Sequence, residues 1–324
     1  MTASTDSPDA PESPVVPARP WPAVRVRVPA TSANLGPGYD CFGLALGRYD
    51  LVTARRTDGP LRITVTGCGS ADVPLTADHL VYRSAVLGFE ALGEPVPRLE
   101  LVCSNEIPHG GGQGSSAAAI VAGIAVARML TPGGPERMSR SDLLNLAAGV
   151  EGHPDNAAPA VLGGFTIAWT EPDGRSQVVQ RPVHPQVRVL LFSARRGSST
   201  ERARALLPTS VPHADAAANS AAAALFVHAI SDEPALLLTA TADYLHQRYR
   251  APSMPETAAL VADLRAAGIA AVVSGAGPSV LAFVTGEIDG RRWQRPGFDL
   301  VELPIDRRGL QIEQIAADAA AFRQ

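Results

Sequence analysis

Lysine is absent from this chain of 324 residues, so all 28 of its basic residues are arginine. This absence excludes three kinds of chemistry that need a lysine amine: a Walker-A phosphate site, a Schiff base and a lysine general base. The 32 acidic residues give a formal net charge of −4, which provides no basic footprint for nucleic acid.

Cysteine and long apolar runs are also scarce. The three cysteines, Cys41, Cys68 and Cys103, are odd in number, widely spaced and without a CxxC pair. We therefore expect reduced thiols in a cytoplasmic protein rather than a disulfide framework or a zinc site. The longest apolar run, Ala117 to Ala127, is too short to span a bilayer, so no membrane partner is expected.

The composition divides the chain into a tail and a larger remainder. Residues 1–22 carry six prolines and lack the apolar segment of a signal peptide, which predicts a disordered tail. The remainder exceeds what one hydrophobic core usually serves. Because the residue pattern changes near residue 183, we expect two domains over 23–183 and 184–324. An apolar content of 46% is ordinary for a soluble globular enzyme.

Hydrophobic periodicity and turn residues predict a mixture of strands and helices. Strands are expected at 24–31, 50–57, 61–67, 99–105, 164–170, 176–183, 187–194 and on both sides of 274–279. Helices are expected at 79–91, 115–130, 139–152, 214–231, 234–249, 255–267 and 313–324, with Ser139 or Ser141 capping the third. Strict βαβ alternation is missing, so the predicted fold class is α+β in two lobes.

One loop combines glycine with hydroxyl side chains. Four of the five residues from Gly110 to Gly114 are glycine, and Ser115 and Ser116 then open a predicted helix. A helix start offers free N–H groups to a phosphate, and glycines let the backbone approach the anion closely. A hydroxyl directly after the loop suits Mg²⁺ beside a triphosphate. The alternative is a plain flexible turn capped by serine.

Three ordered segments resemble the GHMP kinases. PHGGGQGSSAAA (108–119) is similar to their second motif, usually P-x-G-x-G-L-G-S-S-A, while VPATSANLGPGYDCFGLAL (28–46) and SGAGPSVLAF (274–283) resemble the first and third. EGHPDNAAPAVLGGF (151–165) and the segments 199–225 and 245–256 resemble homoserine kinases in particular. The resemblance covers nearly all of residues 24–283.

This resemblance implies a fold, an activity and a nucleotide site. The fold would be an N-terminal ATP-binding lobe like the second domain of ribosomal protein S5, followed by a ferredoxin-like lobe, with the active site between them. The activity would be ATP- and Mg²⁺-dependent phosphorylation of the side-chain hydroxyl of L-homoserine, the step before threonine synthesis. The residues implied to bind ATP are Pro108, His109, Gly110, Gly111, Gly112, Gln113, Gly114, Ser115, Ser116, Ala117 and Ala118.

The resemblance also assigns residues to the charged groups of homoserine. Arg204 and Arg250 stand where the family places its two carboxylate-binding arginines, whose planar guanidinium suits a carboxylate. Thr200 precedes Arg204 by four residues and would share its helix face. Asp40 matches the residue that accepts the ammonium, although an aspartate after Gly-Pro-Gly is also a common turn former.

Further polar residues are implied around the hydroxyl and the metal. Asn34 and Asn156 would orient the hydroxyl, although a helix cap is a reasonable alternative for Asn156. His153 precedes Asn156 and could be a base, although a histidine beside a proline is as often structural. Glu151 and Ser116 look like the Mg²⁺ ligands, with a plain helix-end acid as the alternative for Glu151. We therefore take Asn156, Glu151 and Ser116 as the catalytic set.

A dedicated proton acceptor is not expected. Mevalonate-type relatives use an Asp–Lys pair, but this chain has no lysine and Asn156 stands where we align that aspartate. Phosphoryl transfer depends mainly on positioning and charge neutralisation. The resemblance therefore suggests transfer without a base, the proton leaving through phosphate or water.

Two loop residues depart from the family. Gln113 replaces the usual leucine, and Gly111 stands where close relatives often carry arginine. If residue 113 packs under the loop, Gln113→Leu is expected to leave activity intact or improve it. The rival functions are a GHMP kinase for another hydroxy-amino acid such as threonine, and a catalytically silent binding protein of this fold. A homodimer is expected from the family alone.

Overall fold

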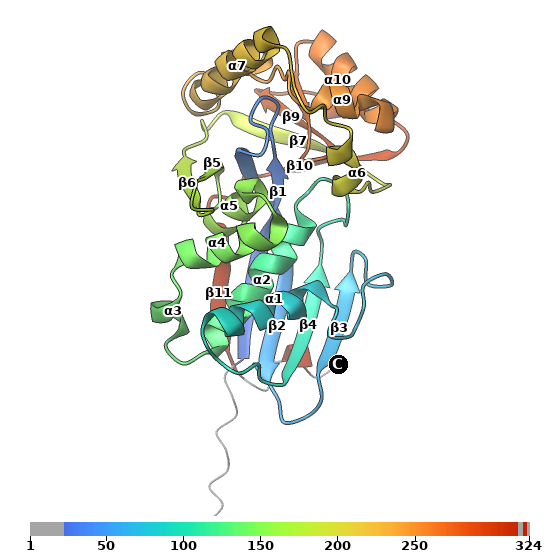
Figure 1. The fold of residues 1–324 in the computed structure, drawn as a ribbon. Helices are drawn as coiled ribbons and strands as arrows, with labels where there is room; N and C mark the ends of the chain where they lie inside the picture. The colour runs from blue at the N-terminus through green and yellow to red at the C-terminus, as the bar shows by residue number, and fades with distance from the viewer. Residues whose placement is uncertain (1–22, 317–319, 323–324) are drawn as a thin grey trace, which may run out of the picture.

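The computed structural model describes residues 23–316 and 320–322, which form two lobes stacked one above the other (Figure 1). Each lobe is built on its own sheet. The first sheet contains β1 (Ala23–Ala33), β2 (Phe42–Arg56), β3 (Arg62–Gly67), β4 (Leu99–Asn105), β5 (Phe165–Thr170), β6 (Ser176–Arg181) and β11 (Gln311–Ile315). The second contains β7 (Val187–Ala194), β8 (Ala270–Val273), β9 (Val280–Thr285) and β10 (Phe298–Leu303).

The helices divide between the same two lobes. The first lobe carries α1 (Leu80–Ala91), α2 (Ser115–Leu130), α3 (Gly134–Arg137), α4 (Arg140–Glu151) and α5 (Pro154–Leu162). The second carries α6 (Thr200–Ala205), α7 (His213–Ser231), α8 (Leu237–Ala240), α9 (Gln247–Arg250) and α10 (Pro255–Ala266). Short 3₁₀ turns are η1 (Pro234–Leu236), η2 (Ala251–Ser253), η3 (Gly290–Trp293) and η4 (Ala320–Phe322).

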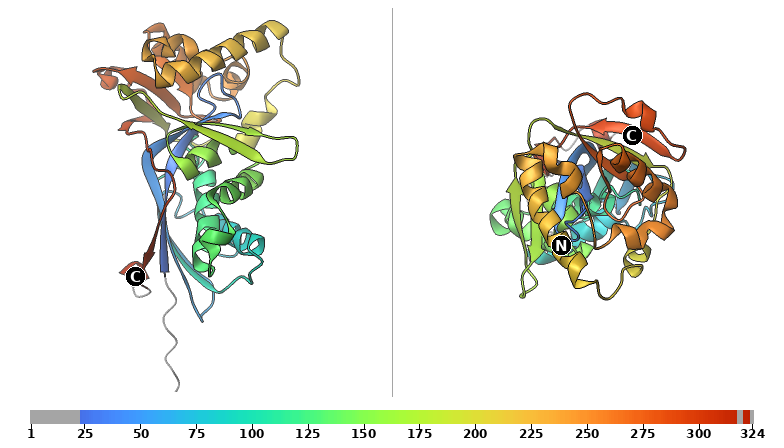
Figure 2. Two further views of the ribbon diagram at one scale, coloured as in Figure 1. Left: turned by 90° about the vertical axis from the view of Figure 1, so that its left-hand side faces the viewer. Right: turned by 90° about the horizontal axis from the view of Figure 1, so that it is seen from above.

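The order of strands confirms the α+β prediction. The first sheet runs β11-β1-β2-β4-β3, with β5 paired to β2 and β6 paired to β5, and only its β3–β4 pair is parallel among the described strands. The second sheet, β10-β7-β9-β8, is antiparallel throughout. The first-lobe helices gather on one face of their sheet (Figure 2). Alternation along β1 directs Val24, Val26 and Val28 into this core, where all three are fully buried.

An aromatic cluster joins the lobes. Phe226 of α7 lies 5.3 Å from Phe42 of β2 and 5.5 Å from Phe165 of β5, measured between ring centroids. On its other side it lies 5.7 Å from Phe283 of β9. Rings at these distances bury large apolar areas and interact favourably edge to face, so the lobes share one continuous core.

Two helix predictions were wrong. Residues 234–249 do not form one helix, because the carboxylate of Asp243 accepts N–H groups from Leu245, His246 and Gln247 and so replaces helical bonds. At the C-terminus, Gln311–Ile315 is strand β11, paired antiparallel with Ala23–Arg27 of β1. Covering the edge of β1 outweighs the helix propensity of Glu313 and Gln314, with which the predicted helix began.

Other predictions hold or lie outside the described residues. Helices α1, α2, α7 and α10 match their predicted ranges within a residue, and Ser139 forms a capping box with Asp142 at α4. The tail predicted for 1–22 and part of the predicted 313–324 helix fall outside the described residues. The division at residue 183 remains a prediction, although β11 returns from the last segment to the first sheet. None of the helices that the structure describes has the length and apolarity to cross a membrane.

The close packing of α1 on α2 gives a stability prediction. A Cβ added to Gly123 of α2 would lie 2.2 Å from the carbonyl oxygen of Val81 and 2.7 Å from the Cβ of Ser84, both in α1. Gly123→Ala should therefore lower the free energy of unfolding by about 2 kcal/mol or more. The control Gly149→Ala adds its Cβ to an exposed helix position with nothing within 4 Å, and should raise stability by about 0.5–1 kcal/mol. Equal effects of the two variants in urea unfolding would refute this packing.

Candidate active site

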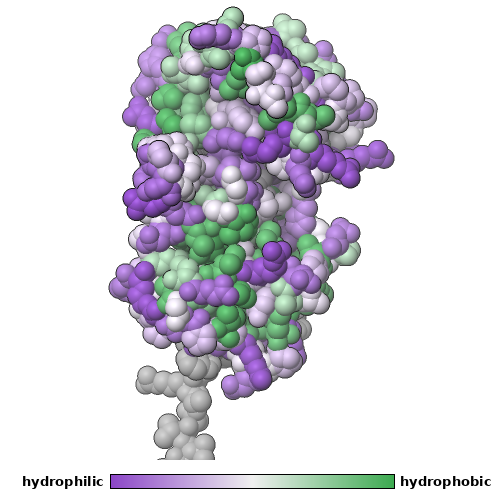
Figure 3. Space-filling model, in the orientation of Figure 1, coloured by the Kyte–Doolittle hydropathy of each residue, from purple (hydrophilic) through white to green (hydrophobic). Residues whose placement is uncertain are grey.

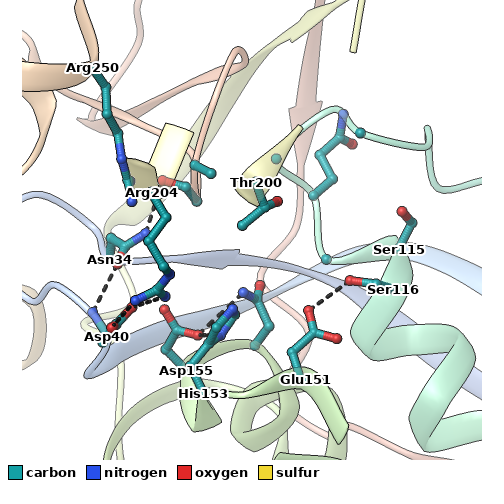
Figure 4. A pocket seen from close by; sticks show the side chains of 17 residues that line it. Asn34, Asp40, Ser115, Ser116, Glu151, His153, Asp155, Thr200, Arg204 and Arg250 are labelled. Atoms are coloured by element: carbon teal, nitrogen blue, oxygen red, sulfur yellow. Dashed lines mark hydrogen bonds and ion pairs between the residues drawn. The ribbon is translucent and has the colours of Figure 1, made fainter. Parts of the chain in front are cut away.

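A cavity of about 200 Å³ lies where the two lobes meet. It brings together four segments that are far apart in the sequence: the turn after β1, the glycine loop, the α4–α5 junction and parts of the second lobe. The lining residues are Asn34, Asp40, Gly110, Gly112, Gln113, Gly114, Ser115, Ser116, Glu151, His153, Asp155, Asn156, Thr200, Arg204, Arg250, Gly275 and Ala276. Figure 4 shows Asp40 and Arg204 on one side of this cavity and Ser116 and Glu151 on the other.

The glycine loop packs against protein on its inner side. A Cβ on Gly112 would lie 2.2 Å from the carbonyl oxygen of Ser274, and one on Gly114 would lie 1.9 Å from Thr31 Oγ1. Both glycines also have positive φ, about 70°. Gly111 has neither restriction, its nearest neighbour being a side-chain atom at 3.3 Å. Gly112 and Gly114 are thus required by the close packing of the loop itself, whatever binds outside it.

Helix α2 presents its N-terminal end to this loop. Its first main-chain bond runs from the Ala118 N–H to the Gly114 carbonyl, at 2.9 Å. The N–H groups of Ser115, Ser116 and Ala117 precede that bond, so they stand at the positive end of the helix dipole. The arrangement suits a bound phosphate.

Ser116 and Glu151 form an oxygen pair beside the helix start. The Ser116 hydroxyl donates to Glu151 Oε1 at 2.7 Å. Burial raises the pKa of Glu151, a shift that the hydrogen bond from Ser116 opposes in part. A carboxylate and a hydroxyl are ligands that Mg²⁺ accepts while it keeps waters and phosphate oxygens. The described residues hold no cluster of three or more His, Cys, Asp or Glu for a metal, so this pair would supply only part of a coordination shell.

Asp40 and Arg204 form an ion pair at the opposite end of the cavity. Arg204 Nη1 and Nη2 each donate to one oxygen of the Asp40 carboxylate at 2.8 Å. These hydrogen bonds raise the pKa of Arg204. Arg204 and Thr200 both belong to α6. The prediction that these two residues lie four positions apart in one helix is therefore confirmed. Two groups of opposite charge are therefore held in a planar, bidentate pair.

Arg250 brings a second guanidinium to the same end of the cavity, and only 1% of this residue is exposed. Its Nε donates to the Ala203 carbonyl at 3.3 Å, and its Nη1 lies 3.3 Å from Nδ1 of His246. Burial lowers the pKa of Arg250, and burial also lowers the pKa of His246. The Tyr39 ring lies 5.4 Å from this guanidinium carbon and 5.5 Å from that of Arg204. A buried cation with neutral hydrogen-bond partners favours an incoming anion.

Asp155 is a site residue that the sequence analysis missed. It is 1% exposed, and its Oδ1 lies 2.6 Å from Nδ1 of His153, the residue before α5. Burial lowers the pKa of His153, but the hydrogen bond and the charge of Asp155 outweigh it and leave the pKa raised. The signal was present in the order His-Pro-Asp-Asn, in which the aspartate stands two residues after the histidine and directly before Asn156.

The two asparagines are held by protein contacts. Asn34 donates from Nδ2 to the Gly275 carbonyl at 2.9 Å and accepts the Asp40 N–H at 2.9 Å. Asn156 accepts the Thr31 hydroxyl at 2.8 Å, while its Nδ2 lies 3.4 Å from Asp155. Asn156 thus keeps an amide N–H group that is only weakly engaged and faces the cavity.

A second cavity of about 240 Å³ adjoins the first on the N-terminal lobe. Ser115 and Ser116 line both cavities, whereas Pro108, Gly111 and Ala117 line neither. The walls of the second cavity are largely apolar and include Val52, Val73, Pro74, Leu80, Val81, Ala118, Ala119 and Ala122; besides the two serines, its polar members are Asp50, Asp78, His79, Asn105 and His109. Apolar side chains also gather on the face of this lobe that its helices form (Figure 3).

Comparison with known proteins gives the family. Residues 79–164 match the family model of the GHMP kinases N terminal domain, and residues 226–296 match GHMP kinases C terminal. Homoserine kinase from Streptomyces avermitilis is 50% identical over 91% of this chain and 97% of its own length. The chain belongs to the homoserine kinase family.

Other members of the homoserine kinase family agree. The enzyme of Streptomyces coelicolor is 49% identical over 91% of this chain and 96% of its own. Among solved structures, homoserine kinase from Cytophaga hutchinsonii superposes with a TM-score of 0.78 at 25% identity, covering 90% of this chain and 97% of the other. Mevalonate kinase from L. major, at 12% identity and a TM-score of 0.63, shares the fold. As a GHMP-family kinase, the protein uses ATP and a small-molecule acceptor.

A buried carboxyl in the second cavity gives a pH prediction. Asp50 of β2 is 6% exposed, and burial raises its pKa to about 6 even though it accepts N–H groups from Glu106 and Ile107. Because this pKa lies above the unfolded value near 3.8, the folded state binds the proton more tightly. The contribution of Asp50 to stability is therefore greatest below about pH 4 and is lost as pH rises through 6.

The matched variant is Asp50→Asn, which cannot titrate. The free energy of unfolding of the wild type, relative to this variant, should fall by roughly 3 kcal/mol between pH 4 and pH 7.5, the equivalent of two pKa units. Urea unfolding at four pH values measures the difference. A difference that is constant with pH would show that folding does not raise the pKa of Asp50.

Proposed function

We propose that this protein transfers the γ-phosphoryl group of ATP to the side-chain hydroxyl of L-homoserine, giving O-phospho-L-homoserine. The observation that carries the proposal is the charge arrangement of the first cavity. Asp40 stands opposite Arg204, with the buried Arg250 nearby. An α-amino acid brings one ammonium and one carboxylate, and these are the two charges that such a site can accept.

The two adjoining cavities divide the substrates between them. The largely apolar second cavity suits the adenine and ribose of ATP, because nucleotide bases bind mainly by apolar contact. Ser115 and Ser116 line both cavities, so the phosphates would lie at the start of α2 and reach into the first cavity. The hydroxyl of the acceptor would then meet the γ-phosphate between Asn156 and the glycine loop.

Binding of homoserine would exchange one ion pair for two. The ammonium of the ligand replaces Arg204 as the partner of Asp40, and its carboxylate gives Arg204 and Arg250 a new acceptor. A ligand that lacks either charge would leave a partly buried group without its partner, which is costly. We therefore infer that the zwitterion, and not one charge alone, is recognised. Thr200, one turn before Arg204, would offer a hydroxyl to the same carboxylate.

The chemical step would use positioned charge rather than a base. The Asp155 hydrogen bond raises the pKa of His153, and the cationic form of its imidazole would suit the charge of the phosphates. Asn156 would orient the hydroxyl, and the proton would leave through phosphate or water.

Ser116 and Glu151 would hold Mg²⁺, which neutralises charge on the β- and γ-phosphates when it is bound. The burial that raises the pKa of Glu151 would be offset by a cation beside it.

Three broader expectations are also carried forward as proposals. The chain would divide into domains near residue 183, and it would act in the cytoplasm, which the three unpaired cysteines support. It would form a homodimer, as expected from the family alone. Size-exclusion chromatography with light scattering tests the last of these.

The proposed function is tested by coupled ADP release with L-homoserine, L-threonine, L-serine and mevalonate as acceptors. We expect kcat/KM for homoserine to exceed every other value by at least tenfold. Glu151→Ala should lower kcat by about a thousandfold, while Glu90→Ala, an exposed helical carboxylate elsewhere on the first lobe, should leave it unchanged. A higher kcat/KM for threonine would reassign the acceptor, and normal turnover by Glu151→Ala would remove that residue from the metal site.

A further inference from the structure

The side chain of Gln113 is buried in the middle of the glycine loop, at the position where the family usually has leucine. Only 1% of the residue is exposed. Its Nε2 donates to the Ser193 hydroxyl at 2.8 Å, and its Oε1 accepts from Arg48 Nη1 at 2.6 Å. Both ends of this amide are therefore engaged by protein groups, and one of the two bonds involves a charged donor.

The two partners of Gln113 belong to different lobes. Arg48 lies in β2 of the first sheet, and Ser193 lies in β7 of the second sheet, where it is 7% exposed. A single side chain from the loop thus links both sheets directly beneath the start of α2. An apolar residue could fill this space, but it could not make either connection.

A bulge in β2 explains how Arg48 reaches the loop. Pro29 of β1 pairs with Tyr49, whereas the next residue of β1 pairs with Leu46. Gly47 and Arg48 are therefore extra residues without partners in this register. Such a bulge turns side chains away from the direction that regular alternation would give them, and here Arg48 is directed at Gln113.

Main-chain bonds hold the loop from other directions. The Gln113 carbonyl accepts the Thr31 N–H at 3.0 Å, and the Gly112 carbonyl accepts the Ser274 hydroxyl at 2.6 Å. These bonds attach the loop to β1 and to the turn after β8. The side-chain amide of Gln113 connects the loop in addition to Ser193 of β7 and to Arg48 of the β2 bulge. The bonds to the Gln113 and Gly112 carbonyls do not make these two connections.

We propose that Gln113 is a positioning residue, whose buried amide fixes the glycine loop and the start of α2 relative to both lobes and so aligns them on the phosphates of ATP. This inference rests on the proposed function, which places those phosphates at the loop. It reverses the expectation that Gln113→Leu leaves activity intact. Leucine would leave the Arg48 guanidinium without this acceptor and the Ser193 hydroxyl without this donor.

The test compares Gln113→Leu, Ser193→Ala and the double variant with the wild type. Gln113→Leu should raise KM for ATP about tenfold, while KM for homoserine changes less than about twofold. Ser193→Ala alone should raise KM for ATP by a smaller factor, and it should have no further effect in the Gln113→Leu background, because its partner is already gone.

Ser231→Ala is the matched control. Ser231 is 8% exposed and donates from its hydroxyl to the Pro182 carbonyl at 2.7 Å, and neither residue lines either of the two cavities. It should lose thermal stability as Ser193→Ala does, yet keep the wild-type KM for ATP. The comparison separates positioning of the loop from a general loss of stability.

Three results would overturn the inference. The first is an unchanged KM for ATP in Gln113→Leu, and the second is independent, multiplying effects of the two single variants. The third is an equal rise of KM for ATP in Ser231→Ala. If the wild type releases no ADP with homoserine, the proposed function fails instead. In that case the dissociation constant of labelled ATP replaces KM for ATP, and the same ordering of the variants is expected. A wild type that binds no ATP would also refute the positioning role of Gln113.

Discussion

The contact between Ser274 and Gly112 is the constraint on which the site depends. The Ser274 hydroxyl donates to the Gly112 carbonyl at 2.6 Å and lies 2.9 Å from the Ser32 hydroxyl. Gly275 donates from its N–H to the Ala33 carbonyl at 3.1 Å. The end of β1, the glycine loop and the turn after β8 therefore meet within a few ångströms. Each segment carries one of the three motifs, and none could move without disturbing the other two.

This junction explains why the glycines are needed. The backbone of the turn after β8 lies so close to the loop that a Cβ on Gly112 would fall 2.2 Å from the Ser274 carbonyl oxygen. The loop is thus clamped from within by protein, and its outer side remains available to a ligand. A loop held in this way is fixed before a ligand binds, which would lower the ordering cost of the proposed triphosphate binding.

The sequence predicted those parts of the molecule that local chemistry controls. The capping serine of α4, the helix that follows the glycine loop and the spacing of Thr200 and Arg204 all follow from residues close together in the chain. Long-range contacts overruled local propensity elsewhere. Gln311–Ile315 pairs with β1 as a strand, although the predicted helix began within it at Glu313, because an open edge of the first sheet would otherwise leave backbone groups exposed.

The candidate site shows the same division. The motifs named most of the cavity's residues, but no pattern indicated that Asp40 and Arg204 pair with each other, since 164 positions separate them. Asp155 was missed although it stands two residues after His153, because only the structure shows that it is buried and bonded to that histidine. The partners of Gln113 were equally hidden, because Arg48 is directed by a bulge and Ser193 comes from the other lobe.

The central claim is that the site exchanges its own ion pair for both charges of a zwitterionic amino acid. Isothermal titration calorimetry tests it most directly, with the protein saturated by a non-hydrolysable ATP analogue and Mg²⁺. The ligands are L-homoserine, 4-hydroxybutanoate, which lacks the ammonium, and 3-aminopropan-1-ol, which lacks the carboxylate. We expect each single-charge ligand to bind about a hundredfold or more weaker than homoserine. Binding of either within about threefold of homoserine would contradict it.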